Sequence, residues 1–322
     1  MKEVLVNFGN QLKDACNLEC VKLPNITEIS NIIVCGMGGS AIAGDLLSCY
    51  LSNELKVPII VNKGYGVPNF VNQNSLVFVS SYSGNTEETL SAYKLAVTYT
   101  KNVLCITSGG KLAELQPDFI LRIPDGYQPR CALGWLFIPM VTALHRLGLI
   151  NDKIPEIIEV AQLILELGDK FSLTDSNPFT IAKTLIDKLP IIYSDSKFSA
   201  VAMRWTTQIN ENSKQFAHYN VFSELNHNEI VGLGEPKIPT TIIILRDKSY
   251  NSRINLRIEL TKRLFYSHTD IYEVESQGES LLARIFYLIY LGDWVSYWLA
   301  VLKGVDPTPI ERIEWLKKEL SK

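Results

Sequence analysis

One short segment, SSYSGNT at residues 80–86, constrains this chain more than any other. Residues 76–79 before it are apolar and predict a strand, and a helical pattern begins at about Glu87. A strand that ends in a Ser/Gly/Thr turn at a helix start directs backbone N–H groups, hydroxyl donors and the positive end of the helix dipole to one point. The segment therefore predicts a phosphate site in a strand–turn–helix unit.

The rest of the first half repeats this alternation of strand and helix. Its strand-like runs are apolar on both faces, which favours a parallel sheet covered by helices on both sides. The strands that we expect are residues 31–35, 59–61, 75–80, 103–107 and 119–122. The helices that we expect are residues 42–53, 87–99, 111–115 and 133–146.

The second half follows the same scheme. We expect strands at residues 190–193, 240–245 and 270–274. We expect helices near residues 156–167, 178–188, 199–213, 253–265, 279–302 and 309–320. The strand–turn–helix layout of residues 32–43 recurs at 190–202 without its glycines, which suggests an internal duplication. Two halves without a shared sheet topology would contradict it.

A segment with Gly148 and Pro155 separates the halves. We therefore expect two α/β subdomains, residues 1–150 and 151–322. Each would contain a mostly parallel sheet flanked by helices.

Composition excludes several classes of protein. Hydrophobic residues make up 47% of the chain, so disorder is not expected. The net charge is -3 and no run of five basic residues occurs, which argues against nucleic acid as a partner. The long apolar segment 281–302 carries Arg284 and Asp293, which a membrane span tolerates poorly. We expect a buried helix there. The first residues lack a signal peptide pattern, and the cysteines discussed next favour a cytoplasmic protein.

The cysteines favour a reducing compartment without a metal site. They are residues 16, 20, 35, 49, 105 and 131. None forms a C-x-x-C pair, and no second His or Cys pair matches Cys16 and Cys20, so we expect no metal. Cys35 and Cys105 lie in expected strands, where a free cysteine is a small core residue.

A second glycine-rich turn, GMGGS at residues 36–40, follows the first expected strand. Glycine accepts positive φ and lets a ligand approach the backbone. A dinucleotide G-x-G-x-x-G loop does not fit, because Ala41 occupies the third glycine position. Turns at the carboxyl ends of neighbouring parallel strands lie where open α/β sheets bind ligands, and a third turn, TSGG at 107–110, would complete the rim.

These motifs resemble a known family. GMGGSAIAGD, SSYSGNTEET and TSGG look like the sugar isomerase (SIS) domain. With PRCALG, QINENSK, ELNHNEIVG and IEWLK in that order, nearly the whole chain resembles the bifunctional phosphoglucose/phosphomannose isomerases of archaea and some bacteria. The resemblance implies two SIS subdomains, each flavodoxin-like, and a homodimer with sites near its interface. It also implies interconversion of glucose 6-phosphate or mannose 6-phosphate with fructose 6-phosphate, without metal or other cofactor.

The resemblance also implies the site residues. The substrate phosphate would be bound by Gly39, Ser40, Ser81, Ser83 and Thr86. Aldose–ketose isomerisation needs a base near C1 and C2, an acid/base at the ring oxygen and a cation for the enediolate.

Glu211 in QINENSK is the candidate base, although a solvated carboxylate at a helix end is the common fate of such a residue. His227 in ELNHNEIVG is the candidate ring-opening acid/base, and the resemblance implies that it can be donated across a dimer. His218 is its rival. His145 is expected in the core and His268 in a loop.

Two cations complete the implied site. Arg130 in PRCALG suits enediolate stabilisation, with an ordinary loop ion pair as the alternative. The family often has a proline where this chain has Gly134, which concerns the shape of that loop. Lys317 in IEWLK matches the family's active-site lysine, and the neighbouring Lys318 competes for the role.

Two other functions remain open from the sequence. A non-catalytic SIS sensor would keep the Ser/Thr turns and would need neither Glu211 nor His227. Another SIS enzyme would act on an amino sugar, a sedoheptulose or a pentose phosphate.

Overall fold

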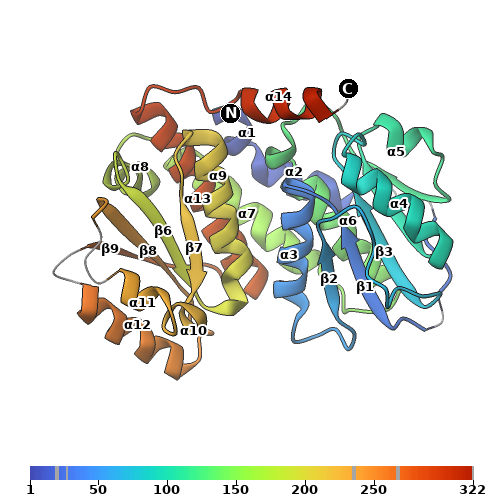
Figure 1. Ribbon diagram of the computed structural model, residues 1–322, viewed down its shortest axis with the longest axis horizontal. Coiled ribbons are helices and arrows are strands. Elements are labelled where there is room, and N and C mark those ends of the chain that lie inside the picture. Colours follow the sequence, from blue (N-terminus) through green and yellow to red (C-terminus); the bar gives the residue numbers. More distant parts are fainter. Residues whose placement is uncertain (19–21, 27, 234–236, 266–268, 321–322) are drawn as a thin grey trace. The chain divides into compact units, whose positions relative to one another are not determined.

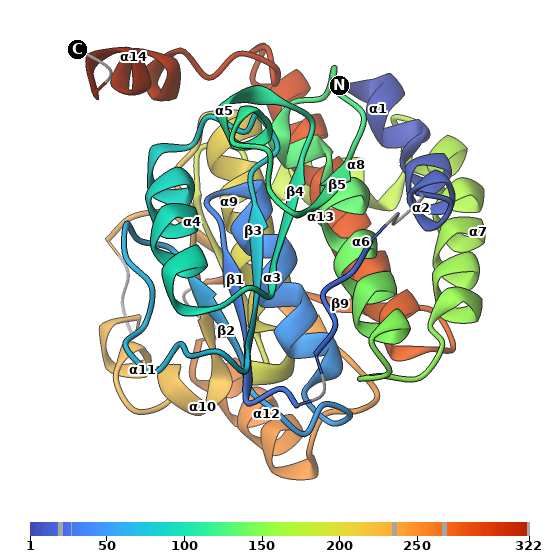
Figure 2. The ribbon, with the colours of Figure 1, turned by 90° about the vertical axis from the view of Figure 1, so that its right-hand side faces the viewer.

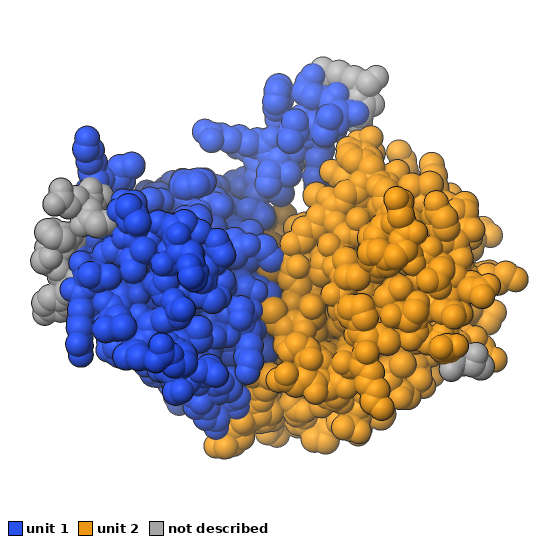
Figure 3. Space-filling view, turned by 60° about the horizontal axis from the view of Figure 1, so that its bottom comes forward, with its two compact units in different colours: residues 1–6, 166–277, 284–322 blue, residues 7–165, 278–283 orange. Residues whose placement is uncertain are grey.

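The structure is a computed structural model that describes residues 1–18, 22–26, 28–233, 237–265 and 269–320. Two residues considered above, Cys20 and His268, lie outside this part of the chain. The chain divides into two compact units, drawn in different colours in Figure 3. Unit 2 comprises residues 7–165 and 278–283, and unit 1 comprises residues 1–6, 166–277 and 284–322. The division falls within helix α7 (Ile154–Phe171), whereas the sequence suggested residue 150.

Unit 2 contains a five-stranded parallel sheet. Its strands are β1 (Asn31–Cys35), β2 (Ile59–Asn62), β3 (Ser75–Ser80), β4 (Val103–Thr107) and β5 (Phe119–Arg122). They lie in the order β2-β1-β3-β4-β5 (Figure 2), and every neighbouring pair is parallel. Each strand coincides with an expected one, because apolar residues that point to both faces of a sheet give a strong strand signal.

Helices cover both faces of this sheet. They are α2 (Phe8–Cys16), α3 (Gly39–Leu51), α4 (Glu87–Tyr99), α5 (Gly110–Glu114) and α6 (Leu133–Arg146). Alternate strand residues such as Ile33, Val77 and Cys105 pack with Ala92 of α4 and Leu112 of α5 on one face. Helix α3 contacts β1, β2 and α6. The predicted α/β sheet flanked by helices is confirmed for this unit.

Unit 1 contains a four-stranded parallel sheet in the order β7-β6-β8-β9 (Figure 1). Its strands are β6 (Leu189–Ser194), β7 (His218–Val221), β8 (Thr240–Arg246) and β9 (Asp270–Glu275). The sequence analysis missed β7, because HYNV is a half-buried edge strand without an apolar run. The order equals that of the first four strands of unit 2, so the two halves share the topology that a duplication requires.

The helices of unit 1 are α1 (Lys2–Val6), α8 (Asn177–Thr184), α9 (Ser199–Ser213), α10 (Phe222–Leu225), α11 (Glu229–Gly232), α12 (Ser252–Phe265) and α14 (Glu311–Leu320), together with most of α13 (Leu281–Leu302).

Helix α13 is the segment whose apolar length raised the question of a membrane span. It is the one helix among the described residues that is long and apolar enough to cross a membrane, but 83% of its most apolar window is buried within the protein. Its two charges are paired, since Arg284 Nε lies 2.8 Å from Asp247 Oδ2 and Asp293 Oδ2 lies 2.8 Å from Arg204 Nη2. The expectation of a buried core helix is confirmed.

Candidate active site

The first glycine-rich turn joins β1 to α3. Gly38 caps the helix with φ of +53°, and Ser40 is buried in the first helical turn. The helix begins at Gly39 rather than at residue 42 as expected. Gly39 and Ser40 therefore lie at the positive end of a helix of 13 residues, where backbone N–H groups and the helix dipole favour an anion.

The second turn, SSYSGNT, lies beside the first. Strands β1 and β3 are paired with Cys35 opposite Val79, so both turns leave the sheet at the same carboxyl edge. Ser81 is buried, and its Oγ donates a hydrogen bond to Thr86 Oγ1 at 3.1 Å. Thr86 is the N-cap of α4. The structure thus brings the phosphate residues predicted in both turns to one edge of unit 2.

The third turn, residues 107–110, packs onto the second. The Ser108 N–H donates to Tyr82 O at 3.0 Å, and the Lys111 N–H donates to Asn85 Oδ1 at 3.0 Å. Gly84 has φ of +67°, and a Cβ there would overlap the carbonyl oxygen of Gly109. The second and third turns are therefore joined by hydrogen bonds and close backbone contacts. The third turn supports the second from the side of β4.

Arg130 lies next to the first turn. It is in the 3-10 helix Pro129–Cys131 and is 4% exposed. A Cβ added to Gly39 would lie 2.6 Å from Pro129 O, so glycine is needed for this approach. The structure therefore places the backbone of the candidate cation against the loop that carries Gly39 and Ser40.

Gln11 is a buried residue that the sequence analysis did not single out. From α2, its Nε2 donates to Cys131 O at 3.0 Å, and its Oε1 accepts from the Gly134 N–H at 2.8 Å. A proline at 134 has no N–H to donate. Where the family often has a proline, this chain has Gly134, whose N–H is used by Gln11. Gln11 thereby holds both Cys131 and Gly134, the two ends of the segment after Arg130.

Glu211 lies in the last turn of α9, in unit 1, and is half-buried. This end of the helix is fixed to α13, since Gln208 Nε2 donates to Asp293 Oδ1 at 3.0 Å and Asn212 Nδ2 donates to Ser296 Oγ at 2.9 Å. Burial raises the pKa of Asp293, although its bonds to Arg204 and Gln208 act in the opposite direction. In QINENSK, Gln208 and Asn212 are therefore structural residues that orient the helix end carrying Glu211.

The two competing histidines differ in their surroundings. His218 Nε2 lies 2.8 Å from Glu229 Oε1. His227, between α10 and α11, is exposed, and its imidazole makes no hydrogen bond to any residue that the structure describes. His145 is half-buried in α6 with its Nδ1 3.4 Å from Ile150 O. An uncommitted imidazole is the better candidate for an acid/base, which favours His227 over His218.

Lys317 lies on α14, an amphipathic helix whose described side chains are largely exposed. Glu211, His227 and Lys317 thus lie on three separate elements of unit 1. The phosphate turns and Arg130 all lie in unit 2.

The core cysteines behave as predicted. Burial raises the pKa of Cys35 to about 11 and that of Cys105 to about 12, which keeps both as neutral thiols. Within the described ranges, no group of three or more His, Cys, Asp or Glu side chains is placed to hold a metal ion.

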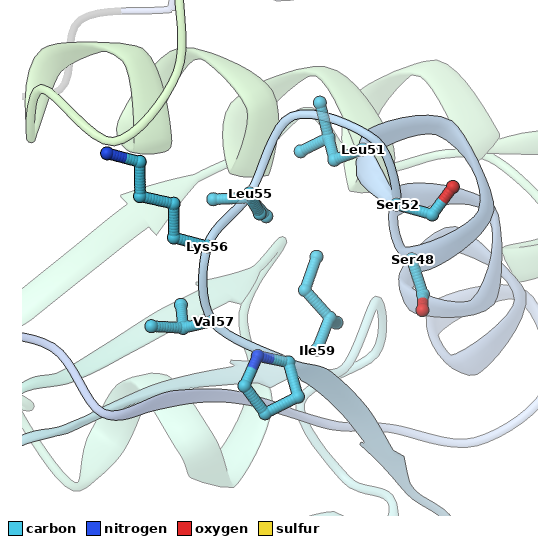
Figure 4. A pocket seen from close by; sticks show the side chains of 8 residues that line it. Ser48, Leu51, Ser52, Leu55, Lys56, Val57 and Ile59 are labelled. Carbon is cyan, nitrogen blue, oxygen red and sulfur yellow. The ribbon is translucent and has the colours of Figure 1, made fainter.

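A surface pocket of unit 2 lies away from these groups. It is lined by Ser48, Leu51, Ser52, Leu55, Lys56, Val57, Pro58 and Ile59 (Figure 4). These residues surround the end of α3 and the start of β2, the opposite edge of the sheet from the turns. At 1.5 Å per residue along α3, Ser48 lies about 14 Å and Ser52 about 20 Å from Gly39. The pocket does not belong to the candidate active site.

Known proteins resemble this chain in sequence. Residues 175–320 match the family model described as the bacterial phospho-glucose isomerase C-terminal SIS domain. The bifunctional phosphoglucose/phosphomannose isomerase of Caldicellulosiruptor bescii is 43% identical over 100% of this chain and 99% of its own. That of Thermoplasma acidophilum is 42% identical over 91% of this chain and 90% of its own.

A solved structure shows the same fold. The C-terminal domain of glucosamine-fructose-6-phosphate aminotransferase from Francisella tularensis has a TM-score of 0.72 at 15% identity, over 94% of this chain and 96% of that one. The family itself follows from the sequence identity over 90% or more of these two relatives. The chain is an enzyme that belongs to the family of bifunctional phosphoglucose/phosphomannose isomerases.

Proposed function

We propose that the protein interconverts glucose 6-phosphate and mannose 6-phosphate with fructose 6-phosphate, by proton transfer through a cis-enediol and without a metal. The observation that carries the proposal is the meeting of two Ser/Gly turns and Arg130 at one sheet edge, in a chain of this family. Hydroxyl groups, helix N-termini and a guanidinium together suit a phosphorylated sugar.

The phosphate end of the sugar would bind at Gly39, Ser40, Ser81, Ser83 and Thr86. Binding energy from this non-reacting group can be used to position C1 and C2. Arg130 would stabilise the negative charge of the enediolate, since a guanidinium stays charged at any working pH.

Three residues of unit 1 would carry the proton transfers. His227 would transfer the proton of the anomeric hydroxyl to the ring oxygen, so that the ring C–O bond breaks and the carbonyl forms. Glu211 would then remove the proton from one carbon and return it to the other, while one proton passes between the two oxygens of the cis-enediol, so that the carbonyl moves between C1 and C2 without net oxidation. Lys317 would add positive charge near the substrate. The exposure of His227 and the fixed helix end beneath Glu211 support these roles.

We further propose that the working enzyme is a cytoplasmic homodimer in which His227 is donated to the partner subunit. An imidazole without a hydrogen bond in its described surroundings supports this arrangement. Dilution below the dissociation constant of the dimer should then abolish turnover, and light scattering measured beside the assay checks the link.

One assay tests the activity. Pure protein is incubated with fructose 6-phosphate and EDTA, and glucose 6-phosphate and mannose 6-phosphate are measured. Both should form. Absence of turnover, with fructose 6-phosphate still bound, would favour the sensor. Glucose 6-phosphate alone would remove the bifunctional activity, and loss of turnover on chelation would remove the metal-free mechanism.

Glu211→Gln tests the proposed base. It should lower kcat about 10²–10⁴-fold, the usual contribution of a general base, while fructose 6-phosphate still binds. Glu259→Gln, an exposed carboxylate of α12 paired with Lys262, is the matched control and should leave kcat unchanged. Collapse of substrate binding in Glu211→Gln would show that the carboxylate serves binding instead of proton transfer.

A further inference from the structure

The His227 loop, defined here as residues 226–229, connects two short helices of unit 1. Its histidine points to no partner among the described residues, but the residues around it are tied to the protein. The His227 N–H donates to Glu224 O at 2.9 Å, and Asn228 Nδ2 donates to Glu224 Oε1 at 2.6 Å. These bonds within the segment set the turn, and two further anchors fasten it on either side.

The first anchor is Asn226, which holds the loop to α12. Its Nδ2 donates to Thr261 Oγ1 at 3.0 Å, and its Oδ1 accepts from Arg257 Nη1 at 3.3 Å. Thr261 is 3% exposed, so this contact is shielded from water. Because both the donor and the acceptor of the amide are used, the orientation of Asn226 is fixed.

The second anchor is Glu229, which holds the loop to the sheet. Tyr193 and Asn220 are register partners on β6 and β7, and His218 lies two residues before Asn220, so the three side chains share one face. Glu229 Oε1 accepts from Asn220 Nδ2 and lies 2.8 Å from His218 Nε2, while its Oε2 accepts from Tyr193 OH at 2.8 Å.

The ionisation of this second anchor favours the bonds. Partial burial raises the pKa of Glu229, but the hydrogen bonds from His218, Asn220 and Tyr193 outweigh it and hold the pKa below its usual value. Burial and the nearby carboxylate of Glu229 raise the pKa of Tyr193. At neutral pH the carboxylate is therefore an acceptor and the phenol a donor.

We propose that Asn226 and Glu229 are positioning residues that hold the loop from both sides and so fix the direction of the unengaged His227. The inference rests on the proposed role of His227 in ring opening. In this proposal His218 is not the acid/base. Its function is to support Glu229. A His227 imidazole that points in the wrong direction would lower kcat, because proton transfer depends steeply on geometry.

Two variants test the two anchors. Glu229→Gln keeps the shape of the side chain but removes its charge, and Thr261→Val removes the acceptor of Asn226 with little change in volume. Each should lower kcat about tenfold and leave KM for fructose 6-phosphate within about twofold. Glu259→Gln and Thr184→Val make the same chemical changes elsewhere in unit 1 and should leave kcat unchanged.

A double-mutant cycle separates positioning from general destabilisation. In a His227→Ala background, Glu229→Gln should cause no further loss, because there is no imidazole left to orient. Equal losses in both backgrounds would overturn the proposal.

Hydrogen exchange gives a readout that does not depend on activity. The amides of residues 224–232 should exchange at least about tenfold faster in Glu229→Gln than in the wild type, with β6 and β8 unchanged. Unchanged exchange would refute the anchor itself. Faster exchange with unchanged kcat would refute its link to catalysis. A wild type that does not isomerise fructose 6-phosphate would instead refute the proposed function, and exchange alone would then decide the anchor.

Discussion

The two sheets have the same strand order, but their carboxyl edges are filled differently. In unit 2, β1 and β3 are followed by GMGGS and SSYSGNT, and neither turn contains a carboxylate. In unit 1, the corresponding strands β6 and β8 are followed by Asp195 and Asp247. Asp195 Oδ1 accepts from the Lys197 N–H at 2.8 Å, and Asp247 Oδ1 accepts from the Ser249 N–H at 2.8 Å.

The difference shows how one topology can leave the candidate phosphate site open in one copy and fill the matching edge in the other. In unit 1 the backbone donors that an anion would use are bonded to the protein's own carboxylates. Asp247 also accepts from Ser276 Oγ at 2.6 Å and from Arg284 Nε at 2.8 Å. A phosphate would meet negative charge there, whereas in unit 2 glycines and hydroxyl groups leave the edge open to it.

The largest effect is expected at the internal carboxylate of unit 1. Asp247→Asn removes the negative charge that pairs with the buried guanidinium of Arg284 and should lower the free energy of unfolding by about 3–5 kcal/mol at pH 7. Burial raises the pKa of Asp247, but its hydrogen bonds with Ser249 and Ser276 and the bond from Arg284 lower it overall.

The pH dependence of this effect follows from the sign of that shift. A carboxyl group with a depressed pKa stabilises the fold above the pKa of the unfolded chain, about 3.9, and the contribution is lost as pH falls through the folded pKa. Urea unfolding of wild type and variant should thus differ most at neutral pH, and the difference should shrink as pH falls below about 3.9 and through the folded pKa. A difference that stays constant over this fall in pH would mean that the charge of Asp247 is not the cause.

The next effect is expected in the open turn of unit 2. Gly39→Ala places a Cβ 2.6 Å from Pro129 O, so the turn and the Arg130 segment must move apart. Because misplacing a substrate-binding group by about 1 Å can cost about 100-fold in rate, this movement should lower kcat/KM for fructose 6-phosphate about 100-fold. Ser196→Ala, at the turn of unit 1 that Asp195 fills, is the control and should have no such effect. Equal losses of kcat/KM in the two variants would show that the two sheet edges do not differ in function.

A smaller effect is expected at Gln11, which supports unit 2 from outside the turns. Gln11→Leu removes the bonds to Cys131 and Gly134 and should lower kcat about tenfold, with a fall in the melting temperature of a few degrees. Steady-state kinetics and thermal unfolding measure both. If Arg130→Ala and the double variant lose equal activity, the effect of Gln11 passes through Arg130.

The smallest effect is expected at Ser83, one exposed hydroxyl of the second turn. Ser83→Ala should raise KM for both aldose phosphates about tenfold, in line with the loss of one hydrogen bond to a charged group. The ratio of glucose 6-phosphate to mannose 6-phosphate formation should not change. A changed ratio would mean that this turn contacts the reacting end of the sugar.

Sequence patterns predicted the parts of this molecule whose causes are local. Strands β1, β3 and β4 are apolar on both faces, and the two Ser/Gly turns follow them directly, so the sheet edge was visible in the residue order. Strand β7 was missed because an edge strand needs no apolar run.

Other features depend on residues that are distant in sequence. Gln11 bonds to Cys131 across 120 positions, and Glu229 meets Tyr193 across 36. A buried glutamine and a glutamate after a histidine give no local sign of such partners. The boundary of unit 2 likewise lies inside a continuous helix, where composition does not change.

The interlock of the second and third turns has a consequence for the thermodynamics of binding. Gly84 and Gly110 bring the backbones of the two turns together at positive φ, so each turn holds the other in place. An anion that binds to donors already held in place would spend little free energy on ordering the protein. Calorimetry of inorganic phosphate binding to the turns of unit 2 should therefore show only a small unfavourable conformational entropy. The free energy of phosphate binding would then remain available for ordering the sugar portion of the substrate.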